Sequence, residues 1–167
     1  MDPRWDTFWS YACSPVNVQR LSGHENSRLT PWLFGGIVTR TEGTAMVTVK
    51  DLEAFGDGWN RHDVDYLMTF MTDDCVFELS AGPDPWGKRF VGKDAVREGF
   101  SGVFKRFPDV HFGNARHFVS GDRGLSEWLF TGTTADGKKV EVTGCDVFTF
   151  RDDKIAVKNS YLKSRTG

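Results

Sequence analysis

Two carboxylates in the last third of the chain, Glu127 and Asp146, are spaced so that a single hairpin would bring them together. Asp136-Gly137 separates two segments of alternating polarity, which is the strongest short signal for a two-residue hairpin turn. Pairing Ala135 with Lys138 across this turn places the two carboxylates directly opposite each other. Opposed Cβ atoms are about 5 Å apart, and like charges at that distance destabilise a sheet unless a third group compensates.

A lysine on the next predicted strand supplies that compensation. A type I turn with Asp153 in the left-handed conformation pairs Phe150 with Lys154. This register puts Lys158 opposite Asp146. Since Asp146 alternates with apolar residues, burial would raise the pKa of its carboxyl, whereas Lys158 would lower it.

These three residues form the predicted catalytic cluster. We expect Asp146 to act as the central acid/base or hydrogen-bond donor, Glu127 as its coupled carboxylate, and Lys158 as the charge that sets their protonation. Two alternatives stay open: a salt-bridge cluster without chemistry, and a register one residue different that turns these side chains outward.

A histidine adds a further candidate. His117 lies on the first long predicted strand, and its ordinary pKa near neutrality suits a general acid or base at a pocket wall. The alternative is a hydrogen-bonded histidine of the strand without chemistry. No two histidines have the spacing of a metal site, so neither a metal nor another cofactor is predicted.

Apolar residues predicted to contact a ligand come from both the helices and the strands. Aromatic rings can stack on a flat ligand, and the alternative for each of them is ordinary packing in the core. The candidates are Phe55, Trp59, Leu79, Phe104 and Leu129.

Hydrophobic periodicity predicts the elements that must position these residues. Helical spacing begins at Asp51, resumes after a possible N-cap at Asp63, and returns after Gly92-Lys93-Asp94. A short strand is expected over 75–80, and period-2 alternation predicts strands near 110–119, 125–134, 139–150 and 155–163. Helices followed by a meander indicate an α+β fold in which a curved antiparallel sheet wraps against N-terminal helices.

Composition limits the class of protein. The 167 residues are 39% hydrophobic and 26% charged with a net charge of -2, which is typical of one globular domain. Without a basic cluster, a nucleic-acid partner is not expected, and no apolar run approaches the roughly 20 residues that span a bilayer. Since the amino terminus also lacks a basic segment followed by an apolar one, we expect a cytoplasmic protein with no membrane partner. The three widely spaced cysteines indicate reduced thiols.

The chain divides into two parts at Met46. Residues 1–45 contain no lysine and no sustained periodicity, so they are expected to be a poorly structured extension, and Met46 is a candidate for the natural start. Residues 46–167 form the predicted domain.

Several short motifs in this domain resemble a known family. They include Asn60-Arg61-His62-Asp63, Thr72-Asp73-Asp74-Cys75, Phe107-Pro108-Asp109, and Asp146-Val147-Phe148-Thr149-Phe150. The pattern, spread over about residues 47–163, is similar to SnoaL-like members of the nuclear transport factor 2-like superfamily, which includes ketosteroid isomerase and polyketide cyclases. The resemblance implies a cone-shaped α+β barrel that encloses a pocket, usually in a homodimer.

The resemblance also bears on the reaction. Asp146 falls on the carboxylic acid of the ketosteroid isomerase oxyanion hole, but the position of that enzyme's base is Leu79 and that of its oxyanion tyrosine is Phe55. Steroid isomerisation is therefore not expected, whereas Glu127 and Lys158 fall on pocket-lining positions.

The function predicted from the sequence is that of a small-molecule pocket protein, with possible acid/base chemistry on an apolar, carbonyl-bearing or cyclic substrate. The alternative is a non-catalytic ligand-binding or dimerisation module. We expect a homodimer through the outer face of the sheet. Ile155, Val157 and Tyr161 would lie on that face, and Lys158 on the other.

Overall fold

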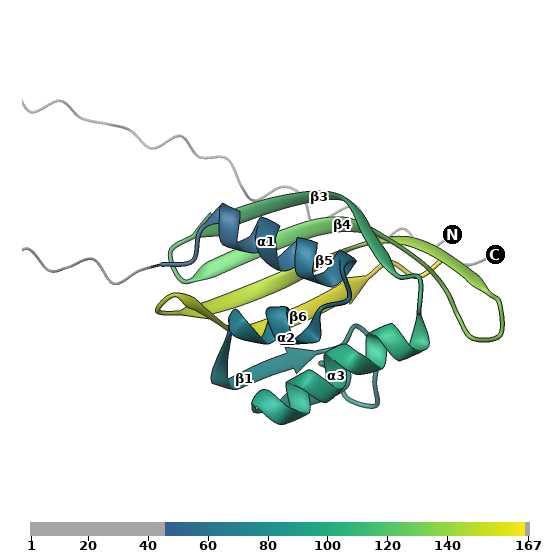
Figure 1. The fold of residues 1–167 in the computed structure, drawn as a ribbon, viewed down its shortest axis with the longest axis horizontal. Helices are drawn as coiled ribbons and strands as arrows, with labels where there is room; N and C mark the ends of the chain where they lie inside the picture. The colour runs from purple at the N-terminus through teal and green to yellow at the C-terminus, as the bar shows by residue number, and fades with distance from the viewer. Residues whose placement is uncertain (1–45, 166–167) are drawn as a thin grey trace, which may run out of the picture. The chain divides into compact units, whose positions relative to one another are not determined.

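The computed structural model describes residues 46–165, and the predicted extension over 1–45 lies outside them. Three helices and six strands make up this part of the chain (Figure 1). The helices are α1 (Val49–Asn60), α2 (Val64–Thr69) and α3 (Lys93–Arg106). The strands are β1 (Met71–Glu78), β2 (Arg89–Val91), β3 (His111–Ser120), β4 (Arg123–Thr133), β5 (Lys139–Arg151) and β6 (Lys154–Leu162).

The six strands form one curved sheet in the order β2-β1-β6-β5-β4-β3, and the helices pack against one of its faces (Figure 1). This confirms the predicted α+β class. One detail differs from the prediction: β1 pairs with β6 in parallel, so the sheet is mixed rather than wholly antiparallel. This arrangement is possible because β2 and helix α3 follow β1 and carry the chain across the sheet to its other edge before β3 begins.

Local sequence explains where α1 and α2 start. The Thr48 side chain accepts from the backbone N–H of Asp51, and the Asp51 carboxylate in turn accepts from the backbone N–H of Thr48, so α1 opens with a capping box. Asp63 caps α2, as predicted, by accepting from the backbone N–H of Tyr66 at 2.9 Å. Both caps satisfy amide groups that the first helical turn leaves unpaired.

The main core fills the space between the helices and the concave face of the sheet. Leu52, Phe55 and Trp59 from α1 contribute at spacings of three and four residues, which places them on one face of the helix. Phe148 and Phe150 alternate on β5 and meet them from the sheet. This packing holds α1 over the strands that carry the predicted site.

The register between β4 and β5 differs from the prediction by one residue. The turn has three residues rather than two, because Thr134 bonds through its N–H to the Lys138 carbonyl and Gly137 takes a φ of 82°. Asp146 therefore pairs with Ser126, and Glu127 pairs with Cys145 on the opposite face. The predicted opposition of Glu127 and Asp146 is wrong, because a shift of one residue turns a side chain to the other face.

The β5–β6 hairpin differs by two residues, which leaves the faces unchanged. The turn is tighter than predicted, since Arg151 pairs with Lys154 and Asp152, not Asp153, has the positive φ of 56°. Asp146 thus pairs with Ser160, and Lys158 pairs with Phe148 two positions along, so Lys158 still lies on the face of Asp146.

An irregularity in the same hairpin corrects the predicted outer face. Phe150 pairs with Ile155 but Thr149 pairs with Val157, so Ala156 is the extra residue of a bulge. Ile155 consequently packs in the core with 1% of its surface exposed, whereas Tyr161 is 53% exposed. Ile155 is therefore not part of the outer face.

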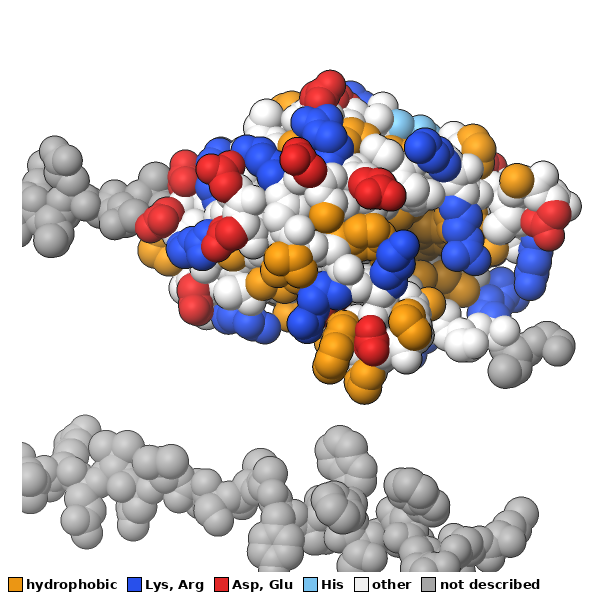
Figure 2. All heavy atoms as spheres, turned by 90° about the horizontal axis from the view of Figure 1, so that it is seen from below, with side chains coloured by type: hydrophobic (Ala, Val, Ile, Leu, Met, Phe, Trp, Pro, Cys, Tyr) orange, Lys and Arg blue, Asp and Glu red, His pale blue; other side chains and the backbone are white. Residues whose placement is uncertain are grey.

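Basic and acidic side chains intermingle on the surface seen in Figure 2, with hydrophobic side chains exposed between them. Within residues 46–165, no helix is both long enough and apolar enough to cross a membrane.

Candidate functional site

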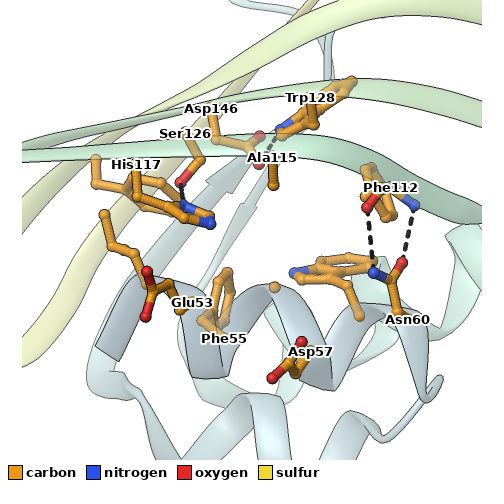
Figure 3. A pocket seen from close by; sticks show the side chains of 14 residues that line it. Glu53, Phe55, Asp57, Asn60, Phe112, Ala115, His117, Ser126, Trp128 and Asp146 are labelled. Carbon is orange, nitrogen blue, oxygen red and sulfur yellow. Dashed lines mark hydrogen bonds between the residues drawn. The ribbon is translucent and has the colours of Figure 1, made fainter. Parts of the chain in front are cut away.

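A cavity of about 150 Å³ lies between α1 and the concave face of the sheet (Figure 3). Aromatic rings form much of its walls, and its polar groups come from α1 as well as from β3, β4 and β5. The lining residues from α1 are Leu52, Glu53, Phe55, Gly56, Asp57, Trp59 and Asn60. Those from the strands are Phe112, Ala115, His117, Ser126, Trp128, Asp146 and Phe148.

The polar groups form one row across the sheet. His117 on β3 pairs with Ser126 on β4, Ser126 pairs with Asp146 on β5, and Asp146 pairs with Ser160 on β6. Directly paired residues point to the same face, so all four side chains share the concave side. An apolar core thus contains a single polar strip, which is the arrangement expected of a ligand site.

Asp146 is held by three donors. Its Oδ1 accepts from Lys158 Nζ at 2.6 Å and from Ser160 Oγ at 2.6 Å, while Oδ2 accepts from the indole Nε1 of Trp128 at 3.0 Å. All four residues are buried. Because an indole N–H and an ammonium group can only donate, Asp146 acts as the acceptor of this network.

Lys158 is enclosed on every side. It also donates to Ser160 Oγ at 2.9 Å, and its Nζ lies 5.1 Å from the ring centre of Trp59 and 4.9 Å from that of Phe77. Burial lowers the pKa of this lysine, and the charge of Asp146 and its hydrogen bond oppose that shift. The lysine lies behind Asp146 rather than on the cavity wall.

His117 presents its ring to the cavity. Its Nδ1 is 2.7 Å from Ser126 Oγ, which fixes the orientation of the imidazole (Figure 3). A Cβ built on Gly56 of α1 would lie 4.0 Å from Nε2, so the imidazole edge that carries this nitrogen lies beside α1, where both residues line the cavity. Burial lowers the pKa of His117, against the opposing charges of Glu53, Asp57 and Asp146.

Two side chains near the end of α1, Trp59 and Asn60, also bring polar atoms to the residues that line the cavity. Asn60 is held by the backbone of β3, since it donates to the Phe112 carbonyl at 3.1 Å and accepts from the Phe112 N–H at 2.8 Å. By contrast, the Nε1 of Trp59 is buried and has no hydrogen-bond partner among residues 46–165. Trp59 as a whole is 4% exposed.

The rim of the cavity on α1 is acidic. Glu53 and Asp57 both line the cavity and are exposed, as residues four positions apart on one face of a helix (Figure 3). No lysine or arginine is among the residues that line this cavity. The rim therefore places negative charge at the entrance.

The structure brings together four of the predicted site residues. Phe55, Trp59, His117 and Asp146 line the cavity, and Lys158 contacts it through Asp146.

The other four predicted residues lie elsewhere. Leu79 and Phe104 are partly buried and pack against the main core, outside the lining of the cavity. Glu127 is exposed and Leu129 half-buried on the outer face, as the one-residue change of register requires. Glu127 and Leu129 line a separate shallow groove of about 700 Å³ together with Cys145, Tyr161, Leu162 and other residues.

Sequence reasoning missed Ser126, which belongs to the polar strip, and Trp128, which donates to Asp146 of that strip. The signal that could have found them is the alternation of Ser126, Trp128 and Phe130 on β4, which matches that of Asp146, Phe148 and Phe150 on β5. A three-residue turn at 135–137 aligns these two sets. The acidic rim carried no such signal, because exposed carboxylates on a helix are common.

Comparison with known proteins agrees with this architecture. The chain is 28% identical to a nuclear transport factor 2-like protein of unknown function from Mesorhizobium loti, with a TM-score of 0.57 over 68% of this chain and 88% of that one. It is 16% identical to a protein with a ketosteroid isomerase-like fold from Catenulispora acidiphila, in complex with trimethylamine (TM-score 0.59, 66% of this chain and 82% of that one). TerC, co-crystallised with polyporic acid, is also 16% identical (TM-score 0.58, 69% and 90%).

The comparison with curated proteins found no match to this sequence. Residues 52–158 match the SnoaL-like domain, and this span includes α1 from Leu52 onward, the polar strip except Ser160, and every residue that lines the cavity. The chain therefore belongs to the SnoaL-like family, with the nuclear transport factor 2-like fold.

Proposed function

We propose that the cavity binds a small, largely apolar molecule, and that His117 acts on this molecule as an acid/base group. The observation that carries the proposal is the imidazole on the cavity wall, with Nδ1 held by Ser126 at 2.7 Å. Of the polar groups in the strip, His117 alone has an ordinary pKa near neutral pH.

Tuning of this imidazole supports a role as a base. Burial lowers the pKa of His117, so the neutral ring predominates at pH 7. When Nδ1–H donates to Ser126 Oγ, Nε2 keeps a lone pair that faces the cavity. A proton taken from a bound ligand then places the positive ring among Glu53, Asp57 and Asp146, whose charges favour it.

Asp146 has a different role in this proposal from the one expected from the sequence. Its two oxygens already accept three hydrogen bonds, so it serves as a fixed carboxylate that orients Trp128 and adds negative charge near His117, rather than as a donor to a substrate oxygen. Lys158 keeps this buried carboxylate paired.

Relatives with the same fold support the binding of small molecules. One was crystallised with trimethylamine and another with polyporic acid. The aromatic walls of the present cavity suit a ligand with an apolar body.

The acid/base role is tested by deuterium exchange of a ketone. In D₂O, a base that removes an α-proton from cyclohexanone leaves an enolate, which then takes a deuteron from the solvent, and NMR follows the loss of the α-proton signal. We expect the wild type to accelerate this exchange and His117→Gln to lose the acceleration. Equal rates in both proteins, with the ketone bound, would instead favour the non-catalytic binding module.

A second observation favours association of two copies through the outer face of the sheet. Tyr161 and Leu162 are 53% and 41% exposed, and they line the shallow groove there with Leu129 and Cys145. We propose that this face pairs with its copy in a homodimer, since exposed apolar side chains gathered in one groove mark an interaction surface.

Light scattering at micromolar concentration tests the dimer. Tyr161→Glu places a charge in the groove and should yield the monomer, while the matched control Val91→Glu, at an exposed position of β2 outside the groove, should leave the mass unchanged. A monomeric wild type would contradict the proposal.

A further inference from the structure

The volume of the cavity limits the size of the ligand that it can enclose. Its volume of about 150 Å³ equals that of an engineered apolar cavity of about 150 Å³ known to take up benzene. A single ring with a short substituent fits this space, whereas fused rings do not.

One of the residues that line the cavity has a buried hydrogen-bond donor without an acceptor. The Nε1 of Trp59 is buried without a partner in the described chain, although the other indole of the wall, Trp128, donates to Asp146. Leaving a buried N–H unpaired is unfavourable, and such groups are nearly always satisfied by protein, water or a ligand. Because Trp59 is one of the residues that line the cavity, a ligand bound there is the partner to test for this N–H.

The charged side chains at the cavity also limit which ligands can bind. Glu53 and Asp57 line it from α1 and Asp146 lines it from β5, where Lys158 balances the last of these. The two rim carboxylates have no such cation among the lining residues. A ligand with a negative charge would be repelled at the entrance.

We propose that Trp59 Nε1 is the hydrogen-bond donor to the ligand, and that the ligand is a single-ring compound with an acceptor atom and without negative charge. This inference rests on the proposed function, because it assigns the kind of molecule that the same cavity takes. His117 acts on that molecule, while Trp59 holds its acceptor atom.

Three probes of equal heavy-atom count separate these requirements: acetophenone carries an acceptor, cumene carries none, and benzoate carries a negative charge. Acetophenone should bind wild-type protein roughly 3- to 10-fold more tightly than cumene, the ratio that one neutral hydrogen bond contributes. Benzoate should bind more weakly than both. In Glu53→Gln/Asp57→Asn, benzoate should gain about two- to fivefold, and added salt should reduce the difference.

The indole resonance gives a readout that does not depend on a variant's folding. In ¹H–¹⁵N spectra, acetophenone should move the Trp59 Nε1–H proton downfield, and cumene should not. Trp59→Phe should abolish the preference for acetophenone over cumene, while the same change at exposed Trp86 should keep it.

The outcomes distinguish this inference from the proposed function. Equal binding of acetophenone and cumene, or an unmoved Trp59 resonance, overturns the role of Trp59 but leaves the cavity a ligand site. Tighter binding of the two-ring ketone 1-acetonaphthone overturns the size limit. If none of the probes binds, the cavity is not a site for such molecules, and the proposed function fails with the inference.

Discussion

Lys158 Nζ lies 2.6 Å from Asp146 Oδ1, although the two residues are not partners in the β5–β6 ladder. Their contact runs diagonally, since Lys158 pairs with Phe148 and Asp146 pairs with Ser160. Their side chains are only 4% and 8% exposed, so this is a buried ion pair. The contact fixes the orientation of the Asp146 carboxylate at the cavity wall.

Breaking the pair from one side should be costly. Lys158→Met leaves a buried carboxylate without its cation, and about 3 kcal/mol of unfolding free energy should be lost in urea denaturation at pH 7. The control is Lys93→Met, which breaks an exposed pair with Asp73 and should cost less than about 1 kcal/mol. Asp146→Asn combined with Lys158→Met should be less destabilised than the sum of the single changes, by about 1 kcal/mol or more. Additive losses would show that the two charges do not stabilise each other.

Glu127 should be uncoupled from Asp146. Its side chain is exposed on the outer face of the sheet, and the polar strip lies on the other face. The coupling free energy between Glu127→Gln and Asp146→Asn should therefore be less than about 0.3 kcal/mol. A double-mutant cycle in urea measures this value. A coupling near 1 kcal/mol would restore the register expected from the sequence.

His117 should contribute to the pH dependence of stability. Because burial lowers its pKa in the folded state, the unfolded chain binds a proton more readily below pH 6.5. The contribution of His117 to stability is therefore present above pH 6.5 and is lost as the pH falls through the lowered folded pKa. Thermal melts from pH 8 to pH 5 should show a smaller loss of stability for His117→Gln than for the wild type. His111→Gln, at an exposed position of the same strand, is the matched control and should follow the wild type.

Two glycines of α1 should respond oppositely to the same change. A Cβ on Gly56 would lie 3.7 Å from His117 Cε1, an ordinary contact, so Gly56→Ala should stabilise the protein by up to about 1 kcal/mol through helix propensity. A Cβ on Gly58 would lie 2.9 Å from Leu67 Cδ2 and from Tyr66 Cδ1. Leu67 is fully buried and has little room to move, so Gly58→Ala should be destabilising. Urea midpoints that rank the two variants in the reverse order would contradict this packing.

Most helices and strands, and the face that each buries, could be predicted from the order of the residues. Helical spacing located α1 with its face of Leu52, Phe55 and Trp59, because apolar periodicity reports directly which side of a helix is buried. Alternation located the four long strands within a few residues. The short strand β2 was missed, since three residues carry no measurable period.

Tertiary structure decided which side chains meet. Whether the turn at Asp136-Gly137 has two or three residues is a local choice of backbone conformation, yet it moves every side chain of β4 to the other face relative to β5. Ser126 thereby replaced Glu127 beside Asp146. The next hairpin differs from the prediction by one residue at its turn and by one more at the Ala156 bulge. Together they leave Lys158 on the predicted face, because a β-strand repeats its faces every two residues.

The bulge at Ala156, the unpartnered indole of Trp59 and the acidic rim likewise exist only in three dimensions. Each depends on residues far apart in the chain, and long-range packing of that kind leaves no periodic trace in the sequence.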